Sequence, residues 1–171
     1  MEEDRFTFEF VENAVRKKTF GILTAIDFKE RPHSTGIIYG VSPPDSPFTL
    51  YILPGDNYAK VRYIRKNPQV SLVVTFPHYW LRFAPASYVM FRGTADILPF
   101  NEPDGIWAMS QSRIGRMNLN TDVEAAGTNM VFIKITPEPT IFCYGLGYGI
   151  MEMRSNHANV GYKVIIPDER H

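Results

Sequence analysis

The chain has 171 residues, of which 44% are hydrophobic and 21% are charged, a composition that is ordinary for a globular protein. Its length suits a single domain over residues 1–171, since domains typically run to roughly 100–200 residues. The 18 Lys and Arg residues balance the 18 Asp and Glu residues. Binding to nucleic-acid phosphates depends on an excess of positive charge, so we expect no nucleic-acid partner.

Metal sites, disulfides and membrane spans are not expected either. The single cysteine, Cys143, excludes an internal disulfide and a Cys-rich zinc site. The four histidines show no metal-binding spacing: His33, His78, His157 and His171. No run approaches the roughly 20 apolar residues of a membrane helix, and the start MEEDRF is acidic, unlike the basic start of a signal peptide. We therefore predict a soluble cytoplasmic protein without a membrane partner.

The first half of the chain alternates apolar strands with turns and two helices. Thr7 is the expected N-cap of an amphipathic helix over residues 7–18. Asp56 or Asn57 is expected to cap a second helix that ends near Lys66, because the Asn-Pro pair that follows disfavours its continuation. The predicted strands of this half are Phe20–Asp27, His33–Val41, Phe48–Leu53 and Val70–Phe76.

The second half is richer in strands. Pro103 is expected to open a helix that runs to about Arg113, and residues 115–128 are polar and predict a loop that could include one helical turn. Gly93 is a candidate β-bulge within a long strand. The predicted strands are Ser87–Leu98, Met130–Ile135, Thr140–Tyr144 and Tyr162–Ile166, with a glycine-rich turn at Gly145–Gly149.

Seven or eight strands thus cluster together and do not alternate strictly with long helices. This order disfavours a parallel, doubly wound fold. We predict a mainly β protein, a closed or split antiparallel β-barrel with peripheral helices.

The second predicted helix carries positive charge at its start. Lys60 and Arg62 lie in its first turns, where cations oppose the helix dipole by a few tenths of a kcal/mol up to about 1 kcal/mol. Arg65 and Lys66 lie at the other end, where cations are favourable. An anionic ligand at the helix start would account for the first pair, because backbone N–H donors and cations would converge on it. A solvated surface helix is the alternative.

The order of these segments resembles the pyridoxamine 5′-phosphate oxidase-like family of flavin-binding split barrels. The resemblance covers residues 20–98 best, through FGILTAID, RPHSTGIIYGV, FTLYIL and AKVRYIRKNPQVSLVV. It implies a homodimeric oxidoreductase that binds FMN at the subunit interface and exchanges a hydride with a small molecule. By this resemblance the flavin ring and ribityl chain would be lined by His33, Ser34, Thr35, Gly36, Tyr51, Ile52 and Leu53, and the phosphate would be held by Lys60 and Arg62.

The substrate is not expected to be pyridoxamine phosphate. True oxidases of that substrate end in a segment with Trp and Arg residues that binds it, whereas this chain ends in GYKVIIPDERH. Two further alternatives stay open on the same fold. The protein could be a reductase that holds a deazaflavin in place of FMN, or a non-catalytic module that stores or senses a flavin or haem.

Other motifs give weaker functional hypotheses. The turn Gly145–Gly149 lacks the glycine spacing and the following helix of a dinucleotide-binding loop, and Cys143 is expected to be an inert core thiol. His78 is a candidate substrate contact, although a structural role is the more common one. The aromatic segment 79–83 predicts a cofactor cover, a dimer contact or ordinary core. No catalytic acid or base is predicted.

Overall fold

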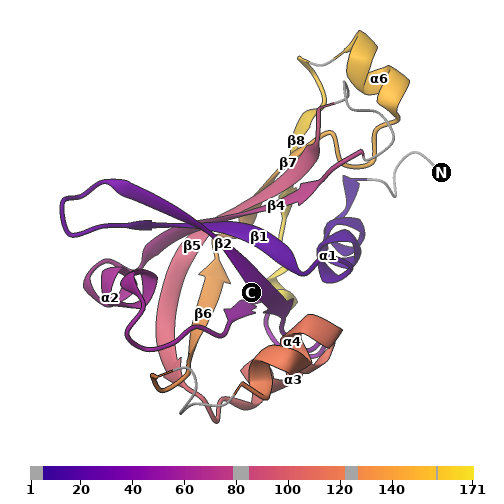
Figure 1. Ribbon diagram of the computed structural model, residues 1–171. Coiled ribbons are helices and arrows are strands. Elements are labelled where there is room, and N and C mark those ends of the chain that lie inside the picture. Colours follow the sequence, from indigo (N-terminus) through magenta and orange to yellow (C-terminus); the bar gives the residue numbers. More distant parts are fainter. Residues whose placement is uncertain (1–5, 79–84, 122–126, 157) are drawn as a thin grey trace.

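The computed structural model describes residues 6–78, 85–121, 127–156 and 158–171. Its strands form one sheet in the order β4-β1-β2-β3-β6-β5-β7-β8, and a further pairing of β4 with β5 closes the first six strands into a barrel (Figure 1). Every strand pair is antiparallel. The strands are β1 (Phe20–Ile26), β2 (Pro32–Val41), β3 (Leu50–Ile52), β4 (Gln69–Phe76), β5 (Ser87–Pro99), β6 (Val131–Pro137), β7 (Thr140–Tyr144) and β8 (Gly161–Ile165).

The barrel is split along β5. This long strand pairs with β6 through Gly93–Pro99 and with β7 through Tyr88–Met90. The pair β7–β8 therefore leaves the barrel and projects from it, with α6 at its tip (Figure 1). The predicted mainly β, split antiparallel barrel is confirmed.

Helices surround the barrel at separate places. The described helices are α1 (Phe8–Arg16), α2 (Ala59–Lys66), α3 (Pro103–Ser110), α4 (Arg113–Leu119), α6 (Ile150–Ser155) and the 3₁₀ turn η2 (Asp168–Arg170). α3 and α4 lie together over β2 and β3, and α2 lies against β1 and β5. The alternation of apolar residues in the strands fills the barrel with buried side chains that include Leu23, Ile37, Leu72, Val74, Val89, Phe91 and Ile135.

The predicted N-cap of α1 is confirmed. The Thr7 side chain accepts a hydrogen bond from the backbone N–H of Phe10, at 3.2 Å. Val11 and Val15 on the inner side of the helix are fully buried, so α1 depends on both its cap and its packing.

Replacing Thr7 with alanine should lower the free energy of unfolding by about 1 kcal/mol, because the Phe10 N–H loses its acceptor. Urea denaturation would measure the change. Thr7→Ser keeps the hydroxyl and should behave like the wild type; equal losses in both variants would contradict a capping role.

Two predicted details are wrong. α2 begins at Ala59, and Tyr58 takes its N-cap position without a side-chain bond, because the Asp56 carboxylate pairs with Arg65 instead. Gly93 forms no bulge, since β4 and β5 pair one to one on both sides of it. A Cβ at this position would lie 2.1 Å from the carbonyl oxygen of Thr136, so close backbone approach explains the glycine.

Other elements differ in extent. The predicted helix to Arg113 is interrupted after Ser110, and α4 begins where Ser112 accepts a bond from the N–H of Gly115. The prediction that no helix follows the glycine-rich turn is wrong: α6 begins directly after it, and the Glu152 carboxylate accepts a hydrogen bond from the Gly149 N–H at 2.6 Å. The residues of the predicted aromatic cover, Tyr79, Trp80, Arg82 and Phe83, lie outside the described part of the chain.

Candidate cofactor site

α2 closes one side of the barrel and contacts the β1–β2 hairpin. Val61 and Ile64 are buried in the core. Tyr63, which precedes Ile64 in the sequence, packs edge-on against the rings of Phe28 and His33, with centroid distances of 5.0 and 5.3 Å. This contact joins α2, through Tyr63, to His33 on β2, the strand that carries four of the predicted cofactor residues.

The first turn of α2 offers unpaired donors. It contains no acidic residue, and its N-cap makes no side-chain hydrogen bond. Within the described residues, no acceptor is found for the backbone N–H groups of Ala59 and Lys60. A helix start of this kind attracts anions through both its open N–H groups and its dipole.

Lys60 stands beside these open donors. Its side chain is half-buried, and Nζ lies 5.8 Å from the centre of the Tyr58 ring. Burial lowers the pKa of Lys60, because desolvation disfavours its charged form. Among the described residues neither Lys60 nor the exposed Arg62 has a carboxylate within salt-bridge distance.

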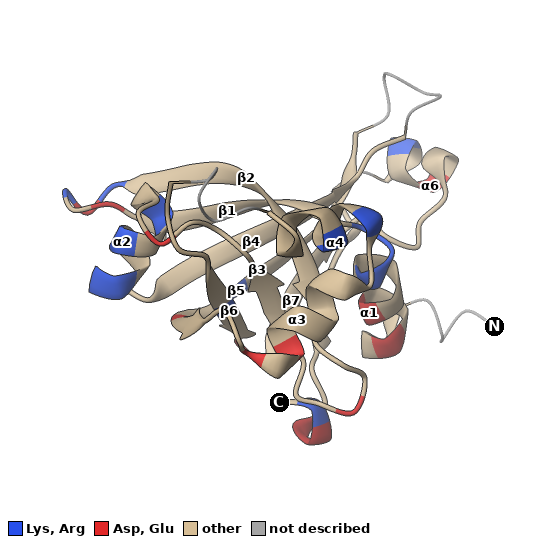
Figure 2. Ribbon diagram, turned by 60° about the horizontal axis from the view of Figure 1, so that its bottom comes forward, with Lys and Arg blue, Asp and Glu red and all other residues tan. Residues whose placement is uncertain are grey.

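The cations at the far end of the helix have partners. Arg65 forms an ion pair with Asp56, and Lys66 lies over the Phe28 ring at 5.5 Å from its centre. Figure 2 shows the basic residues of α2 at one side of the barrel. Among the described residues, Arg65 is thus the one cation of α2 with an acidic partner, and Lys60 and Lys66 each lie over an aromatic ring.

The predicted residues of β2 point to both sides of the sheet. His33 and Thr35 alternate with Ser34 and Gly36, which are exposed on the outside of the barrel. The Thr35 hydroxyl is buried and has no hydrogen-bond partner among the described residues. Ser34 shares a hydrogen bond of 2.8 Å with Thr24. The ring of Phe20 covers Gly36 so closely that a Cβ there would lie 2.9 Å from it.

The predicted residues of β3 are packed inside the protein. Tyr51 lies in a small cluster with α3 and packs edge-on against Phe132, at 6.0 Å. Burial raises the pKa of Tyr51, and its hydroxyl has no partner among the described residues. Ile52 belongs to the barrel core and Leu53 to the cluster under α3. The nine predicted residues thus form three groups, on β2, β3 and α2, and the contact of His33 with Tyr63 joins the first group to the helix.

A row of apolar residues from neighbouring strands crosses the outside of the barrel. We call the surface that carries this row the outer face. Ile22 lies opposite Gly36 on one side and Val73 on the other, and Val73 in turn pairs with Met90 and Met90 with Phe142. Ile22 is 38% exposed although it is surrounded by apolar neighbours. A continuous apolar surface on a folded chain typically marks a site of contact.

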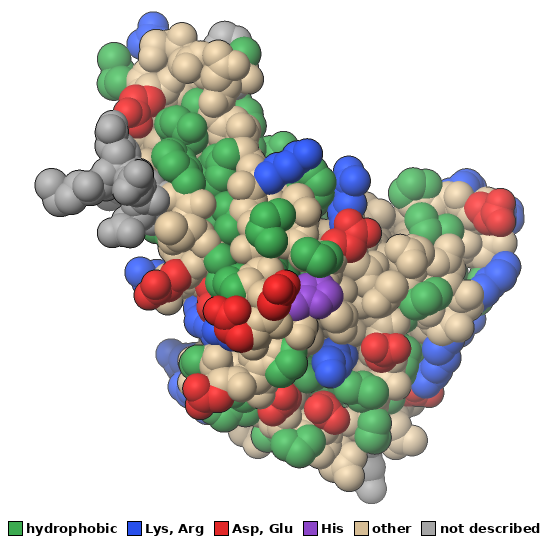
Figure 3. Space-filling view, turned by 180° about the vertical axis from the view of Figure 1, so that it is seen from behind, with side chains coloured by type: hydrophobic (Ala, Val, Ile, Leu, Met, Phe, Trp, Pro, Cys, Tyr) green, Lys and Arg blue, Asp and Glu red, His purple; other side chains and the backbone are tan. Residues whose placement is uncertain are grey.

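Aromatic residues extend the outer face toward the projecting lobe. Phe20 is 51% exposed, and Tyr88 stacks on Tyr144 at 5.4 Å with an angle of 14°. Figure 3, which views the molecule from behind, shows hydrophobic side chains gathered along the lobe of β7, β8 and α6. Met151 and Ile165 are among the most exposed apolar residues of this lobe.

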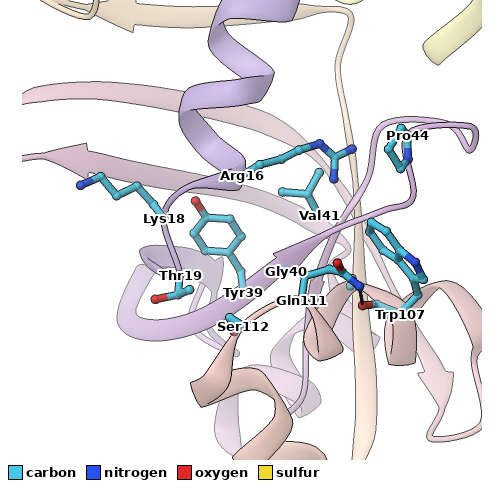
Figure 4. Close-up of a pocket in the computed structure, with 11 residues that line it drawn as sticks. Arg16, Lys18, Thr19, Tyr39, Gly40, Val41, Pro44, Trp107, Gln111 and Ser112 are labelled. Atoms are coloured by element: carbon cyan, nitrogen blue, oxygen red, sulfur yellow. Dashed lines mark hydrogen bonds between the residues drawn. The ribbon is translucent and has the colours of Figure 1, made fainter.

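A pocket of about 410 Å³ opens between the end of α1, β2 and α3 (Figure 4). Trp107 forms one wall, and the Gln111 amide bonds to the Trp107 carbonyl at 3.1 Å. Two cations and no acidic side chain line it. Sequence reasoning missed the pocket, because its walls come from distant segments. The lining residues are Arg16, Lys18, Thr19, Tyr39, Gly40, Val41, Pro44, Trp107, Ala108, Gln111 and Ser112.

Two kinds of site are not found in the described part of the chain. There is no group of three His, Cys, Asp or Glu side chains that could hold a metal ion. Nor is any helix there both long and apolar enough to cross a membrane. Cys143 is buried, and burial raises its pKa to about 11, as expected for an inert thiol.

No protein-family model and no curated protein matches the chain. Solved structures do match. A putative pyridoxamine 5′-phosphate oxidase from Listeria innocua has 21% identity and a TM-score of 0.54, with 78% of this chain and 94% of that one covered. The General Stress Protein 26 from Bacillus anthracis has 18% identity and a TM-score of 0.51, covering 77% and 88%.

A haem protein shares the same architecture. HutZ, the heme storage protein from Vibrio cholerae, has 17% identity and a TM-score of 0.61, with 82% of this chain and 97% of that one covered. At these identities the likeness concerns the fold. The chain has the split-barrel fold of the pyridoxamine 5′-phosphate oxidase-like proteins, as its sequence resemblance implied.

Proposed function

We propose that the protein binds FMN, with the phosphate at the start of α2, and acts as an oxidoreductase on a small molecule. The observation that carries this proposal is the half-buried Lys60, which has no acidic partner among the described residues and stands beside open N–H groups. A phosphate carries close to two negative charges at neutral pH. It would offset the desolvation of Lys60 and accept hydrogen bonds from the helix start.

The residues of β2 support the same placement. The unpaired Thr35 hydroxyl is a buried polar group that a ligand oxygen would satisfy. We propose that His33, on the same side of β2 as Thr35, lines the cofactor beside it, whereas Ser34 and Gly36 could contact it only from the other side of the strand. The side chains of β3 are packed inside the protein, so this strand would support the cofactor wall from behind.

A bound flavin would supply two-electron transfer as hydride. The protein would hold the phosphate through Lys60 and Arg62, keep the ring in place and exclude water from it. We assign no side chain as a catalytic acid or base.

The pocket beside Trp107 is the proposed place of the substrate. Its volume lies within the range of small-molecule sites, and it combines apolar walls with a few polar groups. It is built partly from Tyr39, Gly40 and Val41, which continue the strand that carries His33–Gly36. Cofactor and substrate would thus be positioned by the same strand.

We further propose that the protein is a homodimer joined through the outer face. In a single copy Gly36 and Ile22 of the apolar row are exposed and Val73, Met90 and Phe142 are partly exposed, and a two-fold symmetric contact would bury the row of both copies together. The projecting lobe would then reach the second copy.

The absorption spectrum of the purified protein, before and after addition of FMN, tests the cofactor. We expect the yellow bands of an oxidised flavin, which an electron donor bleaches and a suitable acceptor restores. A deazaflavin would instead give its own bands at shorter wavelength, and the intense Soret band of haem would favour a storage function such as HutZ is named for. A protein that binds none of them would contradict the proposal.

A further inference from the structure

A buried carboxylate joins the two ends of the chain beside the pocket. Glu12 on α1 is only 7% exposed. Its Oε1 accepts hydrogen bonds from Arg16, with Nη2 at 2.6 Å, and from Arg170, with Nη2 at 2.9 Å. Arg170 belongs to η2 and is 158 positions away from Glu12. Arg16 is at the same time a wall of the pocket.

Glu12, Arg16 and Arg170 form a triad whose charges do not cancel. One carboxylate faces two guanidinium groups, which leaves a net charge of about +1 at neutral pH, since arginine stays protonated. If Arg170 were absent, Glu12 would neutralise Arg16 alone. Without Glu12, both guanidinium charges would remain. The charge next to the pocket therefore depends on residues that do not line it.

Arg170 also fixes the opposite wall. Its Nε donates to the carbonyl oxygen of Ser46 at 3.2 Å, and its own carbonyl accepts from the Phe48 N–H at 2.6 Å. Both partners belong to the β2–β3 loop, which carries Pro44 into the pocket. η2 thus holds α1 and this loop together around the pocket.

We infer that Glu12 and Arg170 set the charge that the pocket presents, and that Arg170 thereby makes the pocket selective for small organic anions. The ligand would carry a carboxylate or phosphate toward Arg16 and place an apolar part against Trp107 (Figure 4). Arg170 is a positioning residue in this scheme. The use of the pocket by a substrate rests on the proposed function, whereas its charge is a property of the free protein.

Fluorescence quenching of Trp107 measures this charge directly. Trp80→Phe leaves Trp107 as the one tryptophan of the chain, and all variants are made in that background. Iodide and caesium are used as anionic and cationic quenchers at constant ionic strength. The ratio of their quenching constants reports the sign of the potential at the pocket, independently of changes in general accessibility.

Two substitutions should shift the ratio in opposite directions. Glu12→Gln removes a negative charge and should raise the iodide-to-caesium ratio about twofold; Arg170→Gln removes a positive charge and should lower it about twofold, as expected for one unit charge acting through a largely aqueous surrounding. Arg170→Lys keeps the charge and should match the wild type.

A purely structural role of the triad predicts something else. Loss of packing would raise the quenching constants of iodide and caesium alike in both variants. The iodide-to-caesium ratio would then stay unchanged. That result, or an unchanged ratio in Glu12→Gln, would overturn the inference. If Arg170→Gln does not fold, the comparison of Glu12→Gln with the Trp80→Phe parent is enough to test the inference. Because no flavin takes part, the outcome is independent of whether the protein binds FMN.

Discussion

Replacing Lys60 with alanine should weaken FMN binding by about tenfold to a hundredfold. Removing one charged hydrogen bond to the phosphate costs about 1.5–3 kcal/mol, and 1.4 kcal/mol corresponds to a factor of ten in affinity. The side chain is half-buried and has no acidic partner among the described residues, so no internal ion pair is broken by the change. Quenching of flavin fluorescence on titration with the protein measures the affinity.

Lys66→Ala is the matched control. Lys66 lies on the same helix, at the end where a cation is favourable, and contacts the Phe28 ring. It should leave the FMN affinity within about twofold of the wild type, because Lys66 is at the opposite end of the helix from the proposed phosphate. Equal losses in the two variants would show that general positive charge, and not a defined phosphate site, draws the ligand.

The affinity should also fall with rising pH. Burial lowers the pKa of Lys60 in the free protein, and a bound phosphate would raise it again, since it favours the charged form. The contribution of Lys60 to binding is therefore complete below its pKa in the free protein and is lost as the pH rises toward its pKa in the complex. Lys60→Ala should remove this part of the pH dependence.

Replacing Ile22 with glutamate should convert the proposed dimer into monomers. Ile22 lies in the apolar row of the outer face, between Gly36 and Val73, and is 38% exposed. A two-fold symmetric interface would bury two copies of the new carboxylate, each at a cost on the order of 2 kcal/mol or more. Dissociation should therefore become easier by at least about a thousandfold. Sedimentation at several protein concentrations measures it.

Ile106→Glu is a control of the same chemistry and exposure. Ile106 is 38% exposed, as Ile22 is, but it lies on α3, away from the outer face. We expect this variant to remain dimeric. A wild-type protein that sediments as a monomer at all concentrations would refute the interface, and so would an Ile22→Glu variant that stays dimeric.

The architecture could be predicted from local patterns. Strand alternation, the Thr7 cap and the proline at the start of α3 are short-range signals, and the structure bears them out. The start of α2 could not be placed correctly, because Asp56 is used by Arg65, which lies nine residues further along. The predicted bulge at Gly93 is wrong for a similar reason. A glycine is required there because the Thr136 backbone, on another strand, approaches it closely.

The site was only partly accessible to sequence reasoning. The unusual position of Lys60 at a helix start is a local signal that the sequence contains. The burial of Tyr51 under α3 and the orphan hydroxyl of Thr35 depend on packing between distant segments. The same holds for the pocket, whose cation Arg16 is tied through Glu12 to the last turn of the chain. No spacing of residues in the sequence indicates such a contact.

The most direct test of the central claim compares FMN with riboflavin, which has the same ring but no phosphate. Affinities for both are measured with the wild type and with Lys60→Ala. The wild type should bind FMN about a hundredfold more tightly than riboflavin. Lys60→Ala should lose most of this preference, because the preference depends on the hydrogen bond between the Lys60 ammonium group and the phosphate. Equal affinities for the two ligands in the wild type, or a preference that survives in Lys60→Ala, would contradict a phosphate site at the start of α2.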